Sequence, residues 1–126
     1  MLTTTGAFSG FSVDDQAAAL AFYRDVLGVD AVETGMGLEL RLGGTSTVFV
    51  YPKADHVPAT FTVLNFEVAD IDVAVDELGA AGIELTRYEG AFQDEKGVAR
   101  GKAANRGPDI AWFTDPAGNI LSVLSN

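Results

Sequence analysis

The stretch FSVDDQAAALAFYRDVLGVD, Phe11–Asp30, is repeated with one gap nearly half a chain length later as FEVADIDVAVDELGAAGIE, Phe66–Glu84. Each copy has an alternating strand pattern, an aspartate, an amphipathic helix pattern and then a glycine, Gly28 or Gly82. Two copies are too few for a solenoid, which needs at least three repeats. The chain is therefore expected to consist of two modules with one plan.

The aspartates and glycines mark the ends of the two predicted helices. Asp14 or Asp15 is placed to cap the first helix, and Asp70 the second, by accepting from the unpaired N–H groups of the first turn. Gly28 and Gly82 suit the left-handed position that ends a helix. The apolar stripes that should face the core are Leu20, Tyr23 and Leu27 in the first helix, and Ile71, Ala74, Val75 and Leu78 in the second. All of these roles are structural.

Short strand patterns complete each module. The expected strands are about 7–13, 29–33, 38–42 and 47–51 in the first copy, and about 61–68, 83–88, 109–113 and 120–124 in the second. The prediction is an α+β fold of two βαβββ modules, about 5–53 and about 60–126, which form one domain over 1–126. Their curved mixed sheets are expected to pair around a cavity. Residues 89–108 lack periodicity and are predicted to form a hinged lid over it.

Composition restricts the partners. The chain of 126 residues has 18 acidic and 8 basic residues and a net charge of −10, which argues against nucleic acid and anionic lipid. No apolar run approaches the roughly 20 residues that span a bilayer. The start, MLTTTGAFSG, lacks a basic segment followed by an apolar one, so a cytoplasmic location is expected. The absence of cysteine excludes disulfides and thiolate ligands.

Two motifs resemble a known superfamily. LAFYRDVLG closes the first predicted helix and FTDPAGNILSVL lies at the end of the chain. Together with paired βαβββ modules, they resemble the vicinal oxygen chelate superfamily, which includes glyoxalase I, extradiol dioxygenases, fosfomycin-modifying enzymes and bleomycin resistance proteins. One such scaffold hosts several chemistries, so the resemblance specifies the fold more closely than the function.

The resemblance also implies where metal ligands would stand. Metal-dependent members take a His or Gln from the first strand of each module and a carboxylate from a last strand. Those positions hold Phe8, Val63 and Ser122 here, and the last strand of the first module, STVFVY, has no Asp, Glu, His or Gln. The only histidine, His56, lies in the polar linker KADHVPA. We therefore expect neither a resident metal nor another cofactor.

A cavity without metal would be mostly apolar and suited to an organic ligand. The candidate lining residues are Phe8, Gly10, Phe49, Tyr51, Val63, Asn65, Trp112 and Ser122, with Phe92 and Arg100 from the 89–108 loop. Phe92 would act as an apolar plug, and Arg100 or Lys102 as a cationic contact for an anionic molecule. Trp112 could equally face the helix, because it and Phe113 point to opposite sides of one strand.

Three functional hypotheses remain open. The first is a metal-independent protein that binds and sequesters a small organic molecule, aromatic or cationic, as a homodimer. The second is a lyase, isomerase or dioxygenase-type enzyme, metal-free or with an atypical metal site, that uses Tyr51, His56 or a loop Lys or Arg as acid or base. The third is a metal-dependent glyoxalase-type enzyme, against which the residues at the ligand positions argue. No nucleic acid or membrane partner is expected.

Overall fold

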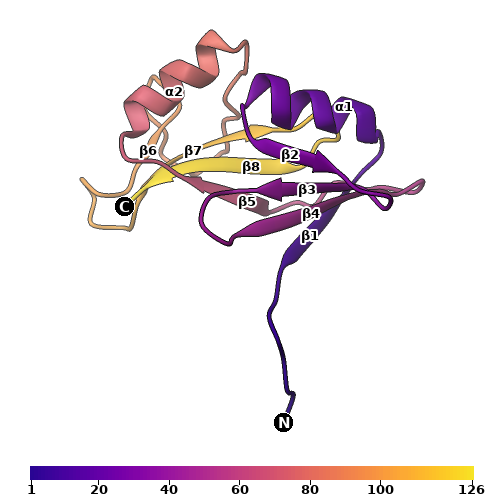
Figure 1. Ribbon diagram of the computed structural model, residues 1–126. Coiled ribbons are helices and arrows are strands. Elements are labelled where there is room, and N and C mark those ends of the chain that lie inside the picture. The colour runs from indigo at the N-terminus through magenta and orange to yellow at the C-terminus, as the bar shows by residue number, and fades with distance from the viewer. The chain divides into compact units, whose positions relative to one another are not determined.

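The computed structural model describes all residues from Met1 to Asn126, and the chain divides into two compact units, Met1–Pro58 and Ala59–Asn126. Each unit contains one four-stranded sheet and one helical segment (Figure 1). The division falls between the two predicted modules. The predictions of one domain and of a cavity shared by the modules stay predictions.

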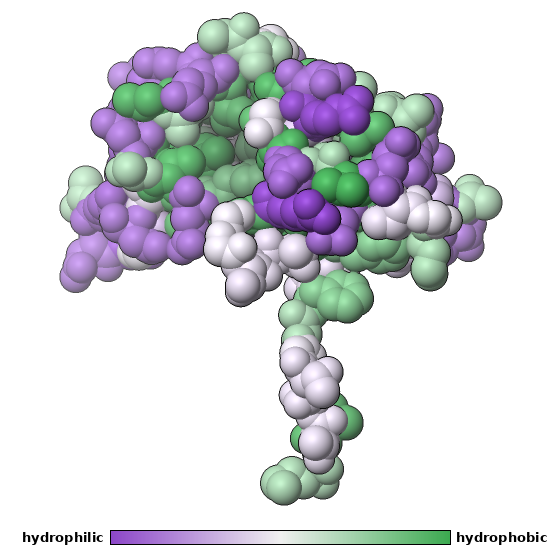
Figure 2. All heavy atoms as spheres, in the orientation of Figure 1, coloured by the Kyte–Doolittle hydropathy of each residue, from purple (hydrophilic) through white to green (hydrophobic).

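The first unit is a βαβββ module. Its elements are β1 (Ser9–Val13), α1 (Gln16–Leu20), the π-helical segment η1 (Ala21–Val26), β2 (Asp30–Glu33), β3 (Leu38–Arg41) and β4 (Thr47–Pro52). The strand order is β1-β4-β3-β2, with β1 parallel to β4 and the other pairs antiparallel. The residues before β1 extend away from their sheet, with Met1 and Leu2 exposed (Figures 1 and 2).

The second unit repeats this topology. Its elements are β5 (Thr62–Glu67), α2 (Ile71–Ala80), β6 (Ala99–Arg100), β7 (Asp109–Thr114) and β8 (Ile120–Ser125). The strand order is β5-β8-β7-β6, with β5 parallel to β8 and the other pairs antiparallel. The predicted α+β fold of two βαβββ modules with mixed sheets is thus confirmed. No helix is both long and apolar enough to cross a membrane.

The helix ends lie where the sequence signals place them. Asp15, rather than Asp14, caps α1 by accepting from the Ala18 N–H at 3.1 Å. Asp70 caps α2 by accepting from the N–H groups of Asp72 and Val73. Gly28 and Gly82 have φ of 74° and 83°, a left-handed conformation that favours glycine.

The first helix contains one feature that the apolar pattern does not predict. After Leu20 the helix widens into a π-helical segment, in which the Leu27 N–H donates to the Phe22 carbonyl at 2.9 Å. Tyr23 is completely buried there and packs against Phe11 and Phe22. The wider turn leaves the apolar stripe intact, so periodicity alone cannot reveal it.

Each unit buries one face of its sheet. In the first unit the core consists of Phe11, Val13, Leu38, Leu40, Val48 and Val50 together with Leu20 and Tyr23. In the second unit it consists of Leu64, Ala111, Phe113, Leu121 and Val123 together with Ile71, Ala74, Val75 and Leu78. Each large aliphatic side chain contributes about 1.5–3 kcal/mol by such burial. The apolar helix positions predicted for α2 are therefore confirmed as core.

The strand expected at 83–88 is wrong. That segment makes only one isolated bridge, Thr86 to Trp112, and the second sheet takes its fourth strand from β6, inside the segment predicted to be irregular. The physical reason is that side chains occupy the backbone groups a strand would use. Gln93 accepts from the Tyr88 N–H at 2.8 Å and donates to the Thr86 carbonyl at 3.0 Å.

Candidate functional site

The helix-free face of the second sheet, opposite α2, carries the main candidate residues. Arg100 reaches Asp72 of α2, so its register partner Asp109 and the alternate residues of β7, up to Phe113, face the helix. Trp112 therefore lies on the helix-free face, which decides the alternative that the sequence left open. Ser122 lies beside it in register, with Asn65 on the other side of Ser122.

Polar side chains on this face bond to one another. Ser122 is completely buried, and its Oγ donates to Oδ1 of Asn65 at 2.5 Å. The indole N–H of Trp112 donates to Oγ1 of Thr62 at 3.2 Å, and the Tyr88 ring packs edge-on against the indole with 5.5 Å between centroids. The indole is held from two sides before any ligand arrives.

A bulge explains why the sequence missed Thr62. Strict alternation along β5 puts Val63 on the same face as Asn65. The register shifts between Thr62 and Leu64, however, so Val63 is the extra residue and Thr62 pairs with Ile120. Thr62 therefore shares the face of Ile120 and Trp112, where strict alternation along β5 would not place it. The expectation that Val63 lines a ligand cavity stays a prediction. Tyr88 was missed because its segment was taken for an ordinary strand.

An aromatic hollow of about 320 Å³ opens beside Trp112. Its lining residues are Thr60, Phe61, Thr62, Tyr88, Glu89, Gly90, Ala91, Trp112 and Ile120. Three of these are aromatic, and Glu89 is the only charged one. The hollow thus offers flat apolar surface with one exposed carboxylate beside it.

An arginine hollow of about 410 Å³ lies next to it and shares Ala91 with the aromatic hollow. Its lining residues are Ala91, Phe92, Ala99, Arg100, Gly101, Ala104, Arg106, Pro108 and Ile110. Both predicted loop residues, Phe92 and Arg100, are among them. No carboxylate lines this hollow.

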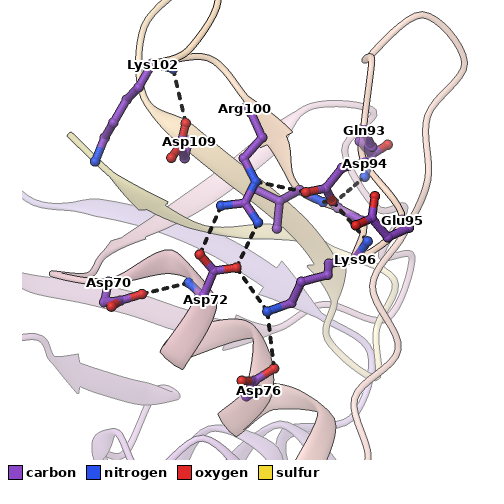
Figure 3. Close-up of polar contacts among 12 residues, drawn as sticks. Asp70, Asp72, Asp76, Gln93, Asp94, Glu95, Lys96, Arg100, Lys102 and Asp109 are labelled. Atoms are coloured by element: carbon purple, nitrogen blue, oxygen red, sulfur yellow. Dashed lines mark hydrogen bonds and ion pairs between the residues drawn. The ribbon is translucent and has the colours of Figure 1, made fainter.

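Arg100, which the sequence predicts as a cationic contact for an anionic molecule, is paired with two carboxylates of the chain. It donates from Nη1 and Nη2 to Asp72 at 3.1 and 2.8 Å, and from Nε to Asp94 at 2.8 Å (Figure 3). The hydrogen bonds to Asp72 and then to Asp94 raise the pKa of Arg100. Lys102, the alternative contact, donates from Nζ to Ser125 at 3.1 Å. The structure therefore ties both predicted cations to the second unit's own acceptors.

The carboxylates of this network stay ionised. Hydrogen bonds from Arg100 and then from Lys96 lower the pKa of Asp72 far below its usual range (Figure 3). Burial alone would raise the pKa of the Asp94 carboxyl, but hydrogen bonds from Arg100 and the Val98 N–H outweigh it and lower that pKa. This part of the unit is a set of paired charges that fixes the loop to α2.

The first unit brings its own candidates together on the helix-free face of its sheet. Gly10 and Phe49 are register partners, and the Phe49 and Tyr51 rings stack with 5.7 Å between centroids. A Cβ on Gly10 would stand 3.0 Å from the Phe49 carbonyl oxygen, so the strands approach closely there. Exposed Phe8 lines a shallow hollow of about 200 Å³ with Glu39, Thr47, Val48 and Phe49.

The sequence did not predict a polar pair in the first unit. Oγ of Ser12, the register partner of Tyr51, lies 2.7 Å from Nδ1 of half-buried His56. A histidine in a polar linker gives no sign that it will fold back onto β1. Ser12 itself could have been found, because alternation places it on the same face as Gly10.

The residues present do not fit a metal ion. Nowhere in the chain do three or more His, Asp or Glu side chains gather in positions that could hold one. At the positions implied by the family resemblance, Phe8 and Val63 have no lone pair to donate, and the hydroxyl proton of Ser122 is directed at Asn65. We derive no chemical step through a metal.

Comparison with known proteins gives a family and a fold. The family model Glyoxalase/Bleomycin resistance protein/Dioxygenase superfamily matches residues 7–123. A glyoxalase family protein from Bacillus anthracis is similar at 18% identity over 100% of this chain and 99% of that one, with a TM-score of 0.69. None of the curated proteins matches.

Two further solved structures are similar. The fosfomycin resistance protein FosX from Listeria monocytogenes shares 12% identity over 99% of this chain and 95% of its own, with a TM-score of 0.66. A lactoylglutathione lyase from Agrobacterium tumefaciens shares 20% identity over 98% and 95%, with a TM-score of 0.63. At these identities the structural likeness establishes the fold alone.

Proposed function

The chain belongs to the glyoxalase/bleomycin resistance protein/dioxygenase superfamily, and on that premise we propose that it binds a planar organic molecule without a metal. The observation that carries the proposal is the aromatic hollow, where Phe61, Tyr88 and Trp112 line about 320 Å³. Sites for small organic ligands combine such walls with a few polar groups. Sequestration of the ligand, rather than its conversion, is the corresponding function.

The indole of Trp112 supports this function because it is already held in place. Its N–H is bonded to Thr62 and its edge is packed by Tyr88. A flat ligand that stacks on such a ring orders no further side chain when it binds, and binding sites gain affinity from that preorganisation.

The charge around the aromatic hollow favours a cation. Glu89 is its only charged lining residue, and the chain has a net charge of −10. A positively charged aromatic compound would gain from both the carboxylate and the aromatic faces. We therefore propose a planar cation as the preferred ligand.

A matched series of quinoline compounds tests the proposal. Trp112 is the only tryptophan, so its fluorescence reports on this hollow alone. N-methylquinolinium is expected to bind and quench it more strongly than neutral quinoline or quinoline-2-carboxylate, with calorimetry as the second measurement. Glu89→Gln should narrow the difference between cation and neutral compound, and Phe49→Leu in the first unit should change nothing. The absence of saturable binding up to millimolar concentration would contradict the proposal.

The metal-free part of the proposal has its own test. Native mass spectrometry with elemental analysis of the purified protein should show no stoichiometric divalent metal, and added zinc, nickel or manganese should leave the binding constants unchanged. A metal ion coordinated by side chains of either sheet would overturn it.

A second candidate function is metal-free acid–base catalysis by the first unit. The observation that favours it is the 2.7 Å contact between Ser12 Oγ and His56 Nδ1, with Tyr51 beside Ser12 in register. Such a pair can move a proton to or from a substrate. Assays of S-lactoylglutathione formation and of fosfomycin ring opening, each with His56→Gln as control, test it. Turnover that survives the substitution would place the chemistry elsewhere.

The state of assembly is also a proposal. We expect a homodimer, as the family resemblance implies, and light scattering after size-exclusion chromatography will measure it. A monomer at micromolar concentration would contradict that expectation, but it would not contradict ligand binding at either hollow of the second unit.

A further inference from the structure

We propose that the arginine hollow is a second binding site, which takes a small organic carboxylate through Arg106. This site differs from the aromatic hollow in its charge, its lining and its expected ligand. It does not rest on the proposed function, since the two hollows share only Ala91 among their lining residues.

Arg106 is the one arginine of the chain whose guanidinium has no acceptor. Arg24 and Arg41 pair with neighbouring carboxylates, and Arg87 donates to two backbone carbonyls. Arg100 is taken up by Asp72 and Asp94. Arg106 instead lies over the Phe92 ring, with its Cζ 5.5 Å from the ring centroid.

The lining of the arginine hollow contains no negative charge to balance Arg106. Apart from the two arginines, the lining residues are all apolar: Ala91, Phe92, Ala99, Gly101, Ala104, Pro108 and Ile110. In a chain with 18 acidic residues, none faces this hollow. An unneutralised guanidinium beside small apolar side chains is complementary to a molecule with one negative charge and an apolar body.

The backbone conformation around Phe92 and Arg106 is unusual at two points. Phe92 has φ of 54°, a conformation that costs a non-glycine residue energy, and the residue is 80% exposed. The Arg106 N–H donates to the Gly101 carbonyl at 2.8 Å and closes the loop that carries the side chain. A Cβ on Gly101 would lie 2.2 Å from the Pro108 carbonyl oxygen, so this closure requires glycine.

The ligand class is set by the number of available charges. A guanidinium binds a carboxylate through two parallel hydrogen bonds. Only one cation of the hollow lacks a partner, so a monoanion is balanced and a dianion is not. A volume of about 410 Å³ has room for an apolar body as well as the carboxylate. We therefore assign the site to a monocarboxylate with an aromatic or aliphatic group.

The test compares 3-phenylpropanoate with its uncharged amide by calorimetry and by amide chemical shifts. The carboxylate is expected to bind saturably and to shift Ala99, Ala104 and Ile110, whereas the amide binds about tenfold more weakly or worse. Arg106→Gln should abolish that difference, and Arg106→Lys should retain part of it. Arg24→Gln, an exposed arginine with its own carboxylate, is the matched control and should bind normally.

Three results would overturn the inference. The carboxylate could bind equally well to the Arg106→Gln variant. It could shift Trp112 and Phe61 instead, which would assign it to the aromatic hollow. Acetate could bind as tightly as 3-phenylpropanoate, which would leave the apolar wall without a role. Because quinolinium binding is measured at Trp112, failure here leaves the proposed function standing, and its failure leaves this site standing.

Discussion

The two copies of the module share one sheet topology, but they differ most in the connection that follows the glycine at the end of each helix. After Gly28 the first copy returns at once into β2 and then β3. After Gly82 the second copy runs through 83–108, with only the two-residue strand β6, before it reaches β7. Segment 88–108 supplies nearly all of the lining of the arginine hollow and one side of the aromatic hollow. The unshared segment therefore completes hollows to which the shared strands also contribute, as Thr62 of β5, Trp112 of β7 and Ile120 of β8 do in the aromatic hollow.

The two connections also differ in the kind of hydrogen bond that holds them. In the first copy, backbone ladders join β2 to β3 and β3 to β4. The second copy also has a backbone ladder, between β7 and β8, but the segment before β6 is fixed largely by side chains. There Arg87 donates to the carbonyls of Asp94 and Glu95, and Gln93 donates to those of Thr86 and Gly97. The connection between β2 and β4 should therefore be sensitive to backbone crowding, and the segment before β6 to the loss of single polar side chains.

The largest effect is expected from crowding in the first copy. A Cβ on Gly37 would lie 2.3 Å from the Val50 carbonyl oxygen, so Gly37→Ala must push β3 from β4. We expect the free energy of unfolding to fall by about 3 kcal/mol. Gly35→Ala, where the added Cβ meets nothing within 4 Å, should change it by less than about 0.5 kcal/mol. Urea titration followed by circular dichroism measures both, and equal effects would show that close approach does not govern this connection.

The second copy should respond most to Asp94→Ala. The Asp94 carboxylate accepts from the N–H groups of Lys96 and Val98 and from Arg100. Its loss leaves these donors without their acceptor, and we expect about 2 kcal/mol of destabilisation, read from Trp112 fluorescence during urea unfolding. The matched control is Asp76→Ala, an exposed carboxylate with one 3.5 Å contact to Lys96. A control variant as unstable as Asp94→Ala would refute a special role for the three contacts of Asp94.

The difference between the copies also explains what the sequence could predict. Periodicity reports elements that bury one face, so the two helices and seven of the eight strands were predicted correctly. The aspartate before the second helix separately predicted the cap at Asp70. It cannot report a loop fixed by Gln93 and Asp94, because such contacts depend on which carbonyls the folded loop presents. The strand expected at 83–88 failed for that reason, and β6 was missed for the same one.

The candidate sites show the same division. Alternation puts Phe49 and Tyr51 on one face of β4, where their rings stack, and Asn65 and Ser122 are register partners on adjacent strands. Their expected role in lining a ligand cavity stays a prediction. A bulge brings Thr62 onto the helix-free face, which strict alternation along β5 does not predict, and bulges leave little trace in one sequence. The sequence predicts Arg100 or Lys102 as the cationic contact for an anionic molecule. Only the folded loop shows that Arg100 pairs with Asp72 and Asp94, whereas Arg106 lies over the Phe92 ring.

A smaller loss of stability, which affects both copies, is expected from substitutions at the helix caps. Asp70 accepts two N–H groups and Asp15 accepts one, so Asp70→Ala should cost about 1 kcal/mol and Asp15→Ala about half as much. Asp14→Ala removes a neighbouring acid that is not the cap and should have no measurable effect. Urea midpoints of the three variants give the comparison. If Asp14→Ala destabilised as much as Asp15→Ala, net charge rather than capping would explain the result.

The smallest effect should be the pH dependence contributed by Asp72, because its ion pairs with Lys96 and Arg100 are partly exposed to solvent, which screens them. These cations lower the pKa of Asp72 in the folded protein. A lowered folded pKa contributes stability above the unfolded value, about 3.9, and that contribution is lost as the pH falls through the folded pKa. The urea midpoint should therefore fall below about pH 4 more steeply in the parent protein than in Asp72→Asn. If the urea midpoint fell with pH equally in the two proteins, the ion pairs of Asp72 would add nothing to stability. The hydrogen bonds that Gln93 and Asp94 make would then hold the segment before β6 without them.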